Sequence, residues 1–327
     1  MVSSISVVIP VYNSELTLAP LVARLEPVLA REARAFEIIL VNDGSHDQSW
    51  NVIRELAVQH ACVRGINLMR NYGQHNALLC GIRQAKYGVI VTMDDDLQHP
   101  PEEIPKLLEK MAEGYDVVYG VPRKLPHSFA RNLLSKLSKR VLSWTMGVKS
   151  LRDINAFRAI RTELRRAFSN YQSPQLLLDV LLSWGTTRFG VVVVDHCPRQ
   201  LGKSNYTLRK LVNQLLLILT GFSTAPLRLA SLVGLTFTCF GVGVLIYVIA
   251  RYLLQGSIPG FPFLASIIAI FSGAQLFALG IIGEYLARMF NRSMERPAYV
   301  ISEMVEPTGQ VDRSLAFQQA RHAETSI

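Results

Sequence analysis

The sequence predicts an α/β domain with a mostly parallel sheet, followed by two transmembrane helices. Residues 1–120 alternate short apolar runs, which are typical of buried strands, with longer stretches of helical periodicity. This alternation is the pattern of βαβ units and a parallel sheet. Two later runs, 229–249 and 261–282, contain no charged residue, and each is long enough to cross a bilayer.

The elements can be placed in order along the chain. Strands are expected at Ile5–Ile9, Phe36–Val41, Val63–Leu68, Val89–Met93, Tyr115–Tyr119, Ala156–Ile160 and Phe189–Val194. Helices are expected at Glu15–Ala33, Asp47–His60, Asn76–Gln84, Glu102–Glu113 and, as a basic amphipathic helix, Ser128–Met146. Ser45 and Gln48 have the spacing of a capping box for the second helix. Because ligands bind beyond the carboxyl ends of parallel strands, we expect a site in the polar segments that follow the strands.

The fourth expected strand ends in three consecutive carboxylates, Asp94, Asp95 and Asp96, within GVIVTMDDDLQHPPEE at 88–103. Like charges at a strand end repel one another and lose hydration unless a cation pairs with them. A divalent metal is the simplest partner, because hard cations take oxygen ligands and share them with phosphates. The alternative is a solvated acidic turn in which the aspartates cap a helix.

Composition limits the partners. The net charge is +9 with a pI near 9.5, and the mean hydropathy is +0.24. A basic balance suits nucleic acid, anionic lipid or phosphorylated substrates, but the acidic cluster argues against a nucleic-acid partner. The first strand is not followed by GxGxxG, which disfavours a dinucleotide cofactor. Four scattered cysteines without a CxxC pair predict a reducing compartment, and the strand pattern at the N-terminus predicts no signal peptide.

The C-terminal third is expected at a membrane. Residues 206–228 are apolar but interrupted by charges, as in helices that lie at the bilayer surface. A buried soluble helix is the alternative for each uncharged run, and two such runs joined by a short loop disfavour it. Arginines and lysines flank the pair, whereas only Arg251 lies in the loop, so the positive-inside rule places both flanks in the cytoplasm. The predicted organisation is a cytoplasmic catalytic domain (1–205), interfacial helices (206–228), two transmembrane helices with a short outside loop (229–287) and a cytoplasmic tail (288–327).

Several motifs in order carry a family resemblance. The stretches VVIPVYNSE (7–15), VNDGS (41–45), RNYGQ (70–74), DDDLQHPPEE (94–103) and ERPAYVI (295–301) resemble glycosyltransferase family 2. With the two apolar runs, the chain is similar to the polyprenyl-phosphate, dolichol-phosphate-mannose-synthase-like branch from residue 5 to about 301. RNYGQHNA at 70–77 is similar to the same stretch of the bacterial undecaprenyl-phosphate formamido-arabinose transferases. This similarity is an indication of which sugar donor is used, and does not assign it. The resemblance implies a nucleotide-diphospho-sugar transferase domain of the GT-A type.

The resemblance also implies roles on the donor side. Pro10, Tyr12 and Asn13 would border the base and ribose of a nucleotide-sugar, and Asp43 would accept from the uracil N3–H. The family usually has Glu directly after Tyr-Asn, where this chain has Ser14, so one nucleotide contact differs.

The same resemblance assigns the acidic cluster. Asp94, Asp96 and Gln98 would hold Mg²⁺ or Mn²⁺, and Asp94 and Asp95 would also lie beside the nucleotide. Asp95 stands where the family more often has a small residue, and it would either ligate in the outer shell or point to solvent. The metal would stabilise the diphosphate as a leaving group.

On the acceptor side, Asp153 matches an aspartate that the family uses near the anomeric carbon of the sugar. The resemblance implies that it acts as the catalytic base or orients the acceptor. The alternative is that Asp153 is an ordinary helix or turn cap. Basic and hydroxyl side chains would bind the lipid phosphate, although such a charge run is usually a solvated face. The loop departs from the family's Gly-x-Ser-Lys-Tyr, because Asn205 replaces the lysine. The phosphate-binding candidates are Arg131, Lys136, Arg140, Arg199, Lys203 and Ser204.

The resemblance implies an inverting transfer of one sugar from a nucleotide-sugar, expected to be UDP-linked, to undecaprenyl or another polyprenyl phosphate. We expect this metal-dependent reaction at the cytoplasmic face of the bacterial inner membrane. One alternative is a processive polysaccharide synthase, but a QxxRW stretch is missing near Trp184. Another is a catalytically inactive membrane scaffold with the same fold, against which the retained carboxylates argue. Glycines in the second apolar run predict a homo-oligomer, with a tetramer as one form.

Overall fold

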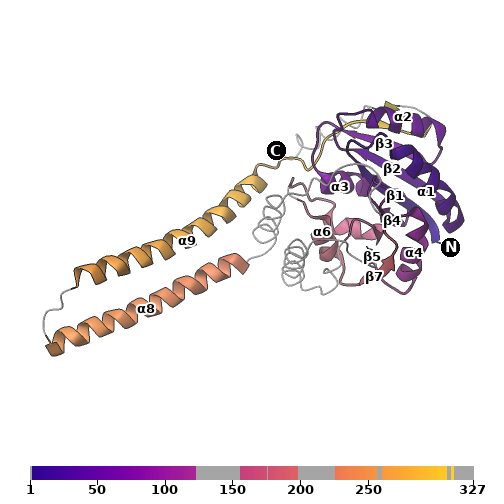
Figure 1. Ribbon diagram of the computed structural model, residues 1–327. Helices are drawn as coiled ribbons and strands as arrows, with labels where there is room; N and C mark the ends of the chain where they lie inside the picture. Colours follow the sequence, from indigo (N-terminus) through magenta and orange to yellow (C-terminus); the bar gives the residue numbers. More distant parts are fainter. Residues whose placement is uncertain are drawn as a thin grey trace. The chain divides into compact units, whose positions relative to one another are not determined.

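The computed structural model describes residues 2–122, 155–174, 176–197, 225–255, 260–307 and 311–312. The chain divides into two compact units, one formed by residues 1–205 with 296–327 and the other by residues 206–295. The first unit is the α/β domain, and the second consists of apolar helices (Figure 1).

The described strands of the first unit form one nine-stranded sheet in the order β7-β5-β6-β4-β1-β2-β3-β8-β9. Its centre is parallel and consists of β4 (Val89–Thr92), β1 (Val2–Val11), β2 (Ala33–Asn42) and β3 (Val63–Leu68). Antiparallel β6 (Arg158–Arg161) lies between β4 and β5 (Val117–Pro122), and β7 (Phe189–Val194) runs parallel to β5. The parallel centre directs four strand ends, and the loops that follow them, to one edge.

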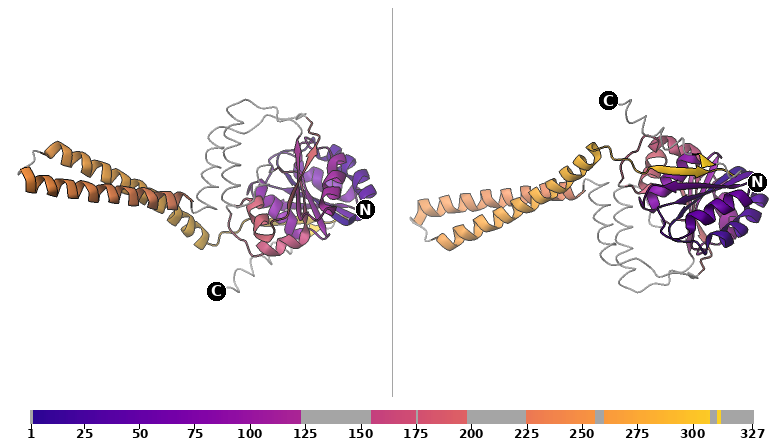
Figure 2. Two further views of the ribbon diagram at one scale, coloured as in Figure 1. Left: turned by 90° about the horizontal axis from the view of Figure 1, so that it is seen from below. Right: turned by 90° about the horizontal axis from the view of Figure 1, so that it is seen from above.

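Helices cover both faces of the sheet (Figures 1 and 2). On one face lie α1 (Leu18–Glu32), α2 (Ser49–Gln59) and α4 (Ile104–Ala112), the last preceded by the 3-10 turn Pro101–Glu103. On the other face lie α3 (Gln74–Gln84) and α6 (Leu178–Gly185), together with the 3-10 segment Thr162–Phe168. The helical periods of residues 1–120 predicted α1, α2, α3 and α4 to within a few residues.

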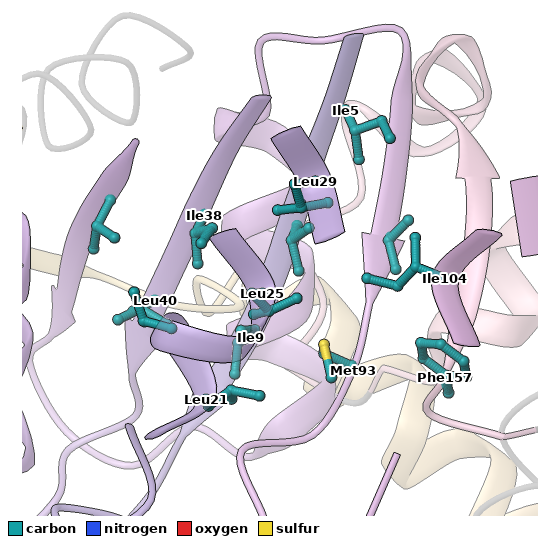
Figure 3. Close-up of a cluster of buried hydrophobic side chains, with 14 of the residues drawn as sticks. Ile5, Ile9, Leu21, Leu25, Leu29, Ile38, Leu40, Met93, Ile104 and Phe157 are labelled. Atoms are coloured by element: carbon teal, nitrogen blue, oxygen red, sulfur yellow. The ribbon is translucent and has the colours of Figure 1, made fainter. Parts of the chain in front are cut away.

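Side chains from α1 and the central strands pack into the larger core (Figure 3). Leu21, Leu25 and Leu29 are four residues apart, so they form one stripe of α1 that faces Ile9 and Ile38. All five side chains are completely buried. Complete burial of a side chain of this size contributes about 1.5–3 kcal/mol, so this stripe fixes α1 on the sheet.

The predicted capping box of α2 is wrong. The Ser45 hydroxyl instead accepts a hydrogen bond from Asn13 N at 3.0 Å, and Gln48 N donates to Glu15 Oε2 at 2.8 Å. Asp47 Oδ1 accepts from Ser49 N at 3.0 Å, so a carboxylate caps the first helical residue. The loop after β1 lies beside this helix start and supplies Glu15, which a local sequence pattern does not show.

The sheet is completed by residues that follow the apolar helices. β8 (Ile301–Val305) pairs antiparallel with β3, and β9 (Val311–Asp312) pairs with β8. β8 and β9 are therefore part of the α/β unit, whereas the sequence predicted a separate tail over 288–327. Buried and half-buried positions do not alternate along the five residues of β8, so a period of two could not predict this strand.

Ion pairs fasten the same C-terminal segment to the sheet. Arg64, on β3, bonds to Glu306 through Nε and Nη2 and to Glu37 through Nη1 at 3.0 Å. The side chains of Arg64 and Glu37 are almost completely buried. Ser6 Oγ and Lys86 N also donate to Glu37, so every charge in the cluster has a partner.

The second unit contains α8 (Ala225–Gln255) and α9 (Phe261–Ser293). Within them, Pro226–Leu254 and Ile270–Ser293 are long and apolar enough to cross a membrane. Both helices extend beyond the predicted runs 229–249 and 261–282. The two helices contact each other where the rings of Phe237 and Phe271 meet edge to face, with centroids 5.8 Å apart.

We expect Arg64→Leu to lower the stability of the α/β unit by about 3 kcal/mol, because it leaves Glu37 buried without its cation. Thermal unfolding of the full chain in detergent measures the effect. Arg24→Leu is the matched control, because the Arg24–Glu102 pair is exposed and contributes about 0–1 kcal/mol. Equal melting temperatures for the two variants would contradict this assignment.

Candidate active site

Four loops meet at the carboxyl edge of the parallel strands. They follow β1 (residues 12–16), β2 (43–48), β3 (69–73) and β4 (93–99). The parallel register of β4, β1, β2 and β3 puts all four at the same edge, which is where ligands bind in such sheets. The structure thus brings together the four sequence motifs that lie far apart in the chain.

Asp43 is the buried carboxylate of this edge. Its Oδ1 accepts a hydrogen bond from Tyr72 N at 2.7 Å, and its Oδ2 accepts one from Gly73 N at 2.9 Å. Burial raises the pKa of the Asp43 carboxyl, and the two backbone N–H groups oppose that rise. The carboxylate therefore fixes the loop after β3 against the loop after β2.

The neighbouring glycine allows this close approach. Gly44 has a φ of 66°, and a Cβ there would lie 2.4 Å from Asn71 N and 2.5 Å from the Arg70 carbonyl carbon. Any side chain would push the loop away from Asp43, so the VNDGS motif requires glycine at this position.

The loop after β1 presents two of the predicted nucleotide contacts. The Tyr12 ring is 44% exposed and lies edge-on to His46 at 6.4 Å. Asn13 has a φ of 54°, and its Oδ1 accepts from His46 N at 2.8 Å. Pro10 is buried within β1, opposite Val41 of β2, so its backbone shapes the strand end below these residues.

Asp95 connects the loops after β4 and β1. Its Oδ2 accepts a hydrogen bond from Tyr12 N at 3.2 Å. Burial raises the pKa of this carboxyl, whereas hydrogen bonds from Ser14 and Tyr12 lower it. The Asp95 carboxylate thus holds the neighbouring loop, and its role as an outer-shell metal ligand stays a prediction.

Asp94 and Asp96 lie on either side of Asp95 and are half-buried. Asp94 Oδ1 accepts from Gln74 Nε2 at 2.6 Å, and Asp96 Oδ1 accepts from Gln98 N at 3.1 Å. Leu97, which follows Asp96 and precedes Gln98, has a φ of 59°, so the chain turns sharply here. Sequence reasoning missed Gln74, although the RNYGQ motif ends on it.

The acidic cluster fits a hard divalent cation only in part. Carboxylate and amide oxygens are the ligands that Mg²⁺ and Mn²⁺ take. In the described part of the chain, however, no three His, Cys, Asp or Glu side chains are grouped as a metal centre. A cation held by Asp94, Asp96 and Gln98 would thus take its remaining ligands from water and substrate oxygens, as cations that bind phosphates commonly do.

His99 and Asn155 form a second polar pair behind the β4 loop. His99 is buried and stacks on Phe157 with centroids 5.3 Å apart. Burial, and then the neighbouring His196 ring, lower the pKa of His99 to about 4, so the imidazole is neutral. Asn155 Nδ2 lies 3.0 Å from His99 Nε2 and also donates to Gly120 O at 2.8 Å. Asn155 follows the candidate base Asp153 by two residues, and sequence reasoning missed the pair because neither residue belongs to a periodic pattern.

A buried ion pair supports the same strand end. Arg158 on β6 pairs with Asp179 on α6 and donates from Nε to Thr92 Oγ1 at 3.0 Å. The Tyr119 hydroxyl donates to Asp179 Oδ1 at 2.8 Å. This network ties β4, β5, β6 and α6 together directly behind the acidic loop, and its members are separated too widely in the sequence to be paired from it.

The acceptor-side predictions lie outside the described residues. These are the candidate base and the candidate phosphate-binding residues, and their assignments stay predictions: Asp153, Arg131, Lys136, Arg140, Arg199, Lys203 and Ser204.

Comparisons with known proteins identify the family of the chain. The model of the family described as "Glycosyl transferase family 2" matches residues 6–167. Proteins named undecaprenyl-phosphate 4-deoxy-4-formamido-L-arabinose transferase are similar over nearly the whole chain. The one from Shewanella sediminis is 36% identical over 307 residues, covering 92% of both chains. The one from Klebsiella pneumoniae strain 342 is 36% identical over 309 residues, covering 93% of this chain and 94% of the relative.

Among solved structures, glucosyl-3-phosphoglycerate synthase from Mycobacterium tuberculosis in complex with phosphoglyceric acid is similar with a TM-score of 0.49 and 16% identity. The match covers 68% of this chain and 80% of that one.

These findings confirm the resemblance and the fold class that the motifs predict. The matched region 6–167 contains the strand-end loops of the site, and the full-length relatives extend the similarity over both apolar helices. The chain belongs to glycosyl transferase family 2 and is a glycosyltransferase with a GT-A-like domain.

Proposed function

We propose that this glycosyltransferase moves one sugar from a UDP-linked donor to undecaprenyl phosphate, or another polyprenyl phosphate, with inversion at the anomeric carbon. The observation that carries the proposal is similarity over 92% of the chain to proteins whose name gives undecaprenyl phosphate as the acceptor. The product would be a lipid-linked sugar of the cell envelope.

The donor side supports a nucleotide with an imide N–H. Each oxygen of Asp43 accepts one backbone hydrogen bond and retains further lone-pair capacity. An acceptor held in this way suits the N3–H of uracil. The exposed ring of Tyr12 and the side chain of Asn13 lie on the adjacent loop, where they can border the base and ribose.

Asp94, Asp96 and Gln98 would hold Mg²⁺ or Mn²⁺, which neutralises charge on a departing nucleotide diphosphate. The chain's own contribution is orientation. Gln74 donates to one oxygen of Asp94, and Gln98 N donates to one oxygen of Asp96, so both carboxylates are held in place before substrate arrives.

The acceptor needs little activation. The second pKa of a phosphate monoester is about 6, so its oxygen is largely anionic at pH 7. That oxygen forms the new bond to the anomeric carbon while the bond to the nucleotide diphosphate breaks on the opposite side. Asp153 would act as base or orient the attacking oxygen, and the basic residues around Arg131 and Lys203 would bind the phosphate charge.

The connectivity supports a two-pass membrane topology. β8 follows α9 in the chain yet belongs to the same sheet as β1–β4, so both flanks of the helix pair lie on one side of the bilayer. Two crossings satisfy this condition, and the positive-inside rule places that side in the cytoplasm. Self-association through the glycine-bearing helix stays a prediction.

A donor panel tests the proposal directly. Purified full-length protein in detergent is given undecaprenyl phosphate, Mg²⁺ or Mn²⁺, and radiolabelled UDP- or GDP-sugars. We expect label to pass from a UDP-sugar into a solvent-extractable lipid. Transfer from GDP-sugars alone would reject the UDP donor, and long polymer in place of a single-sugar lipid would favour a processive synthase.

We expect Asp96→Ala to reduce transfer at least about 1000-fold, because it removes a carboxylate that would hold the cation against the leaving diphosphate. Turnover in purified protein at saturating metal measures the loss. Glu102→Ala is the control, because its exposed carboxylate lies on the same segment but pairs with Arg24. Wild-type turnover of the Asp96 variant would refute the role of this carboxylate.

We expect Asp43→Asn to weaken UDP binding by about 1–3 kcal/mol. Both carboxylate oxygens of Asp43 accept a hydrogen bond from a backbone N–H, and in the variant an amide NH₂ group would replace one of these oxygens and face an N–H donor. Calorimetric titration with UDP gives the dissociation constant. Asp47→Asn is the control, since Asp47 caps α2 from the same loop. An unchanged constant would show that Asp43 does not contribute to the nucleotide subsite.

A further inference from the structure

The chain segment just after the second apolar helix is buried in the α/β unit. It lies in the motif ERPAYVI at 295–301, to which the proposed function assigns no role. Ala298 is 3% exposed and Tyr299 is 6% exposed, and both belong to the core between the sheet and α3. Ile301 begins β8, so the segment joins α9 to the sheet edge.

This segment supports the loop after β3 through the backbone. Met69 N donates to Val300 O at 3.0 Å, and Leu68 pairs with Ile301 in the β3–β8 ladder. Three residues later, Tyr72 N and Gly73 N donate to Asp43. The first residue of the loop that fixes the nucleotide-side carboxylate, Met69, therefore donates a hydrogen bond to this segment.

The same segment supports α3 through the Tyr299 side chain. Burial raises the pKa of the Tyr299 hydroxyl to about 12, and the neighbouring Cys80 and Arg83 side chains of α3 also act on this pKa. The Arg83 guanidinium lies 5.8 Å from the Tyr299 ring centre. Arg83 also donates to the carbonyls of Ser169 at 2.8 Å and Tyr171 at 2.6 Å, which fixes α3 against the chain that follows the 3-10 segment.

The backbone contacts of Val300 and the side-chain contacts of Tyr299 both support elements that hold donor-side carboxylates. At the start of α3, Gln74 Nε2 donates to Asp94 Oδ1, and Asn76 Nδ2 donates to Tyr72 O at 2.7 Å. Asn76 thereby joins the helix to the Asp43 loop. Two sets of contacts, joined through Asn76, thus lead from Tyr299 and Val300 to Asp94 and Asp43.

We propose that residues 298–301 are positioning residues for a nucleoside diphosphate, holding the 69–73 loop and α3 in the arrangement that fixes Asp43 and Asp94. The inference rests on the proposed function only for the identity of the ligand. It makes the donor subsite dependent on chain that is synthesised after both apolar helices.

Another part of the same strand provides the contrast. Trp50 Nε1 donates to Glu303 Oε1 at 2.5 Å, which anchors β8 to α2. This hydrogen bond joins β8 to α2, and neither of its two residues belongs to the 69–73 loop or to α3. A general loosening of β8 and a specific effect on the donor subsite can therefore be separated by comparing variants of Tyr299 and Trp50.

The experiment uses full-length protein in detergent with Tyr299→Leu, Tyr299→Phe and the control Trp50→Phe. Hydrogen exchange of the Tyr72 and Gly73 amides reports directly on the bonds to Asp43. We expect Tyr299→Leu to accelerate exchange at both amides about tenfold, and Tyr299→Phe, which keeps the ring, about threefold. Trp50→Phe should leave both amides within about twofold of the wild-type rate.

UDP titration with Mg²⁺ is the second readout, with an expected loss of about tenfold in affinity for Tyr299→Leu and no loss for Trp50→Phe. Exchange at Tyr72 and Gly73 that is unchanged in both Tyr299 variants, or raised equally by Trp50→Phe, would overturn the inference. If Tyr299→Leu does not fold, Tyr299→Phe decides. Wild-type protein that binds no UDP would reject the proposed donor, while the exchange rates would still decide the positioning role.

Discussion

The site depends on one buried carboxylate that accepts hydrogen bonds from two consecutive backbone N–H groups. Asp43 draws the loop after β3 over the end of β2, and Gly44 leaves room for the approach. A carboxylate in this position requires its donors, because burial without them would favour the protonated form. The geometry is therefore set by the chain itself before any ligand binds, which is what a preorganised subsite requires.

Comparable contacts extend around the edge of the sheet. Asp95 holds the loop after β1 through Tyr12 N, and Gln74 connects the start of α3 to Asp94. Behind these contacts, the Arg158–Asp179 pair and the His99–Asn155 pair fill the space between β4, β6 and the helices. The polar groups at the edge thus join loops that would otherwise move independently, and each loop carries one part of a family motif.

The sequence predicted the central strands and α1–α4 because their periods of two and 3.6 residues are local properties. It also predicted that Asp43 and the acidic cluster share an edge, since parallel strands end together. It did not predict that Glu15 and Asp47, and not Ser45 and Gln48, cap α2, because the loop after β1 supplies Glu15. The contacts of Gln74, His99 and Asn155 were likewise not predictable, since each depends on a residue distant in sequence.

β8 has a consequence for how the protein is made. The bond between Trp50 and Glu303 joins residues 253 positions apart, and two long apolar helices lie between them. Pairing across such a separation is slow and late in folding. Until the ribosome has released residue 301 and beyond, β3 is an edge strand with unpaired backbone groups, open to mispairing with other chains. β3 of a nascent chain is therefore open to mispairing for as long as the two long apolar helices take to be synthesised.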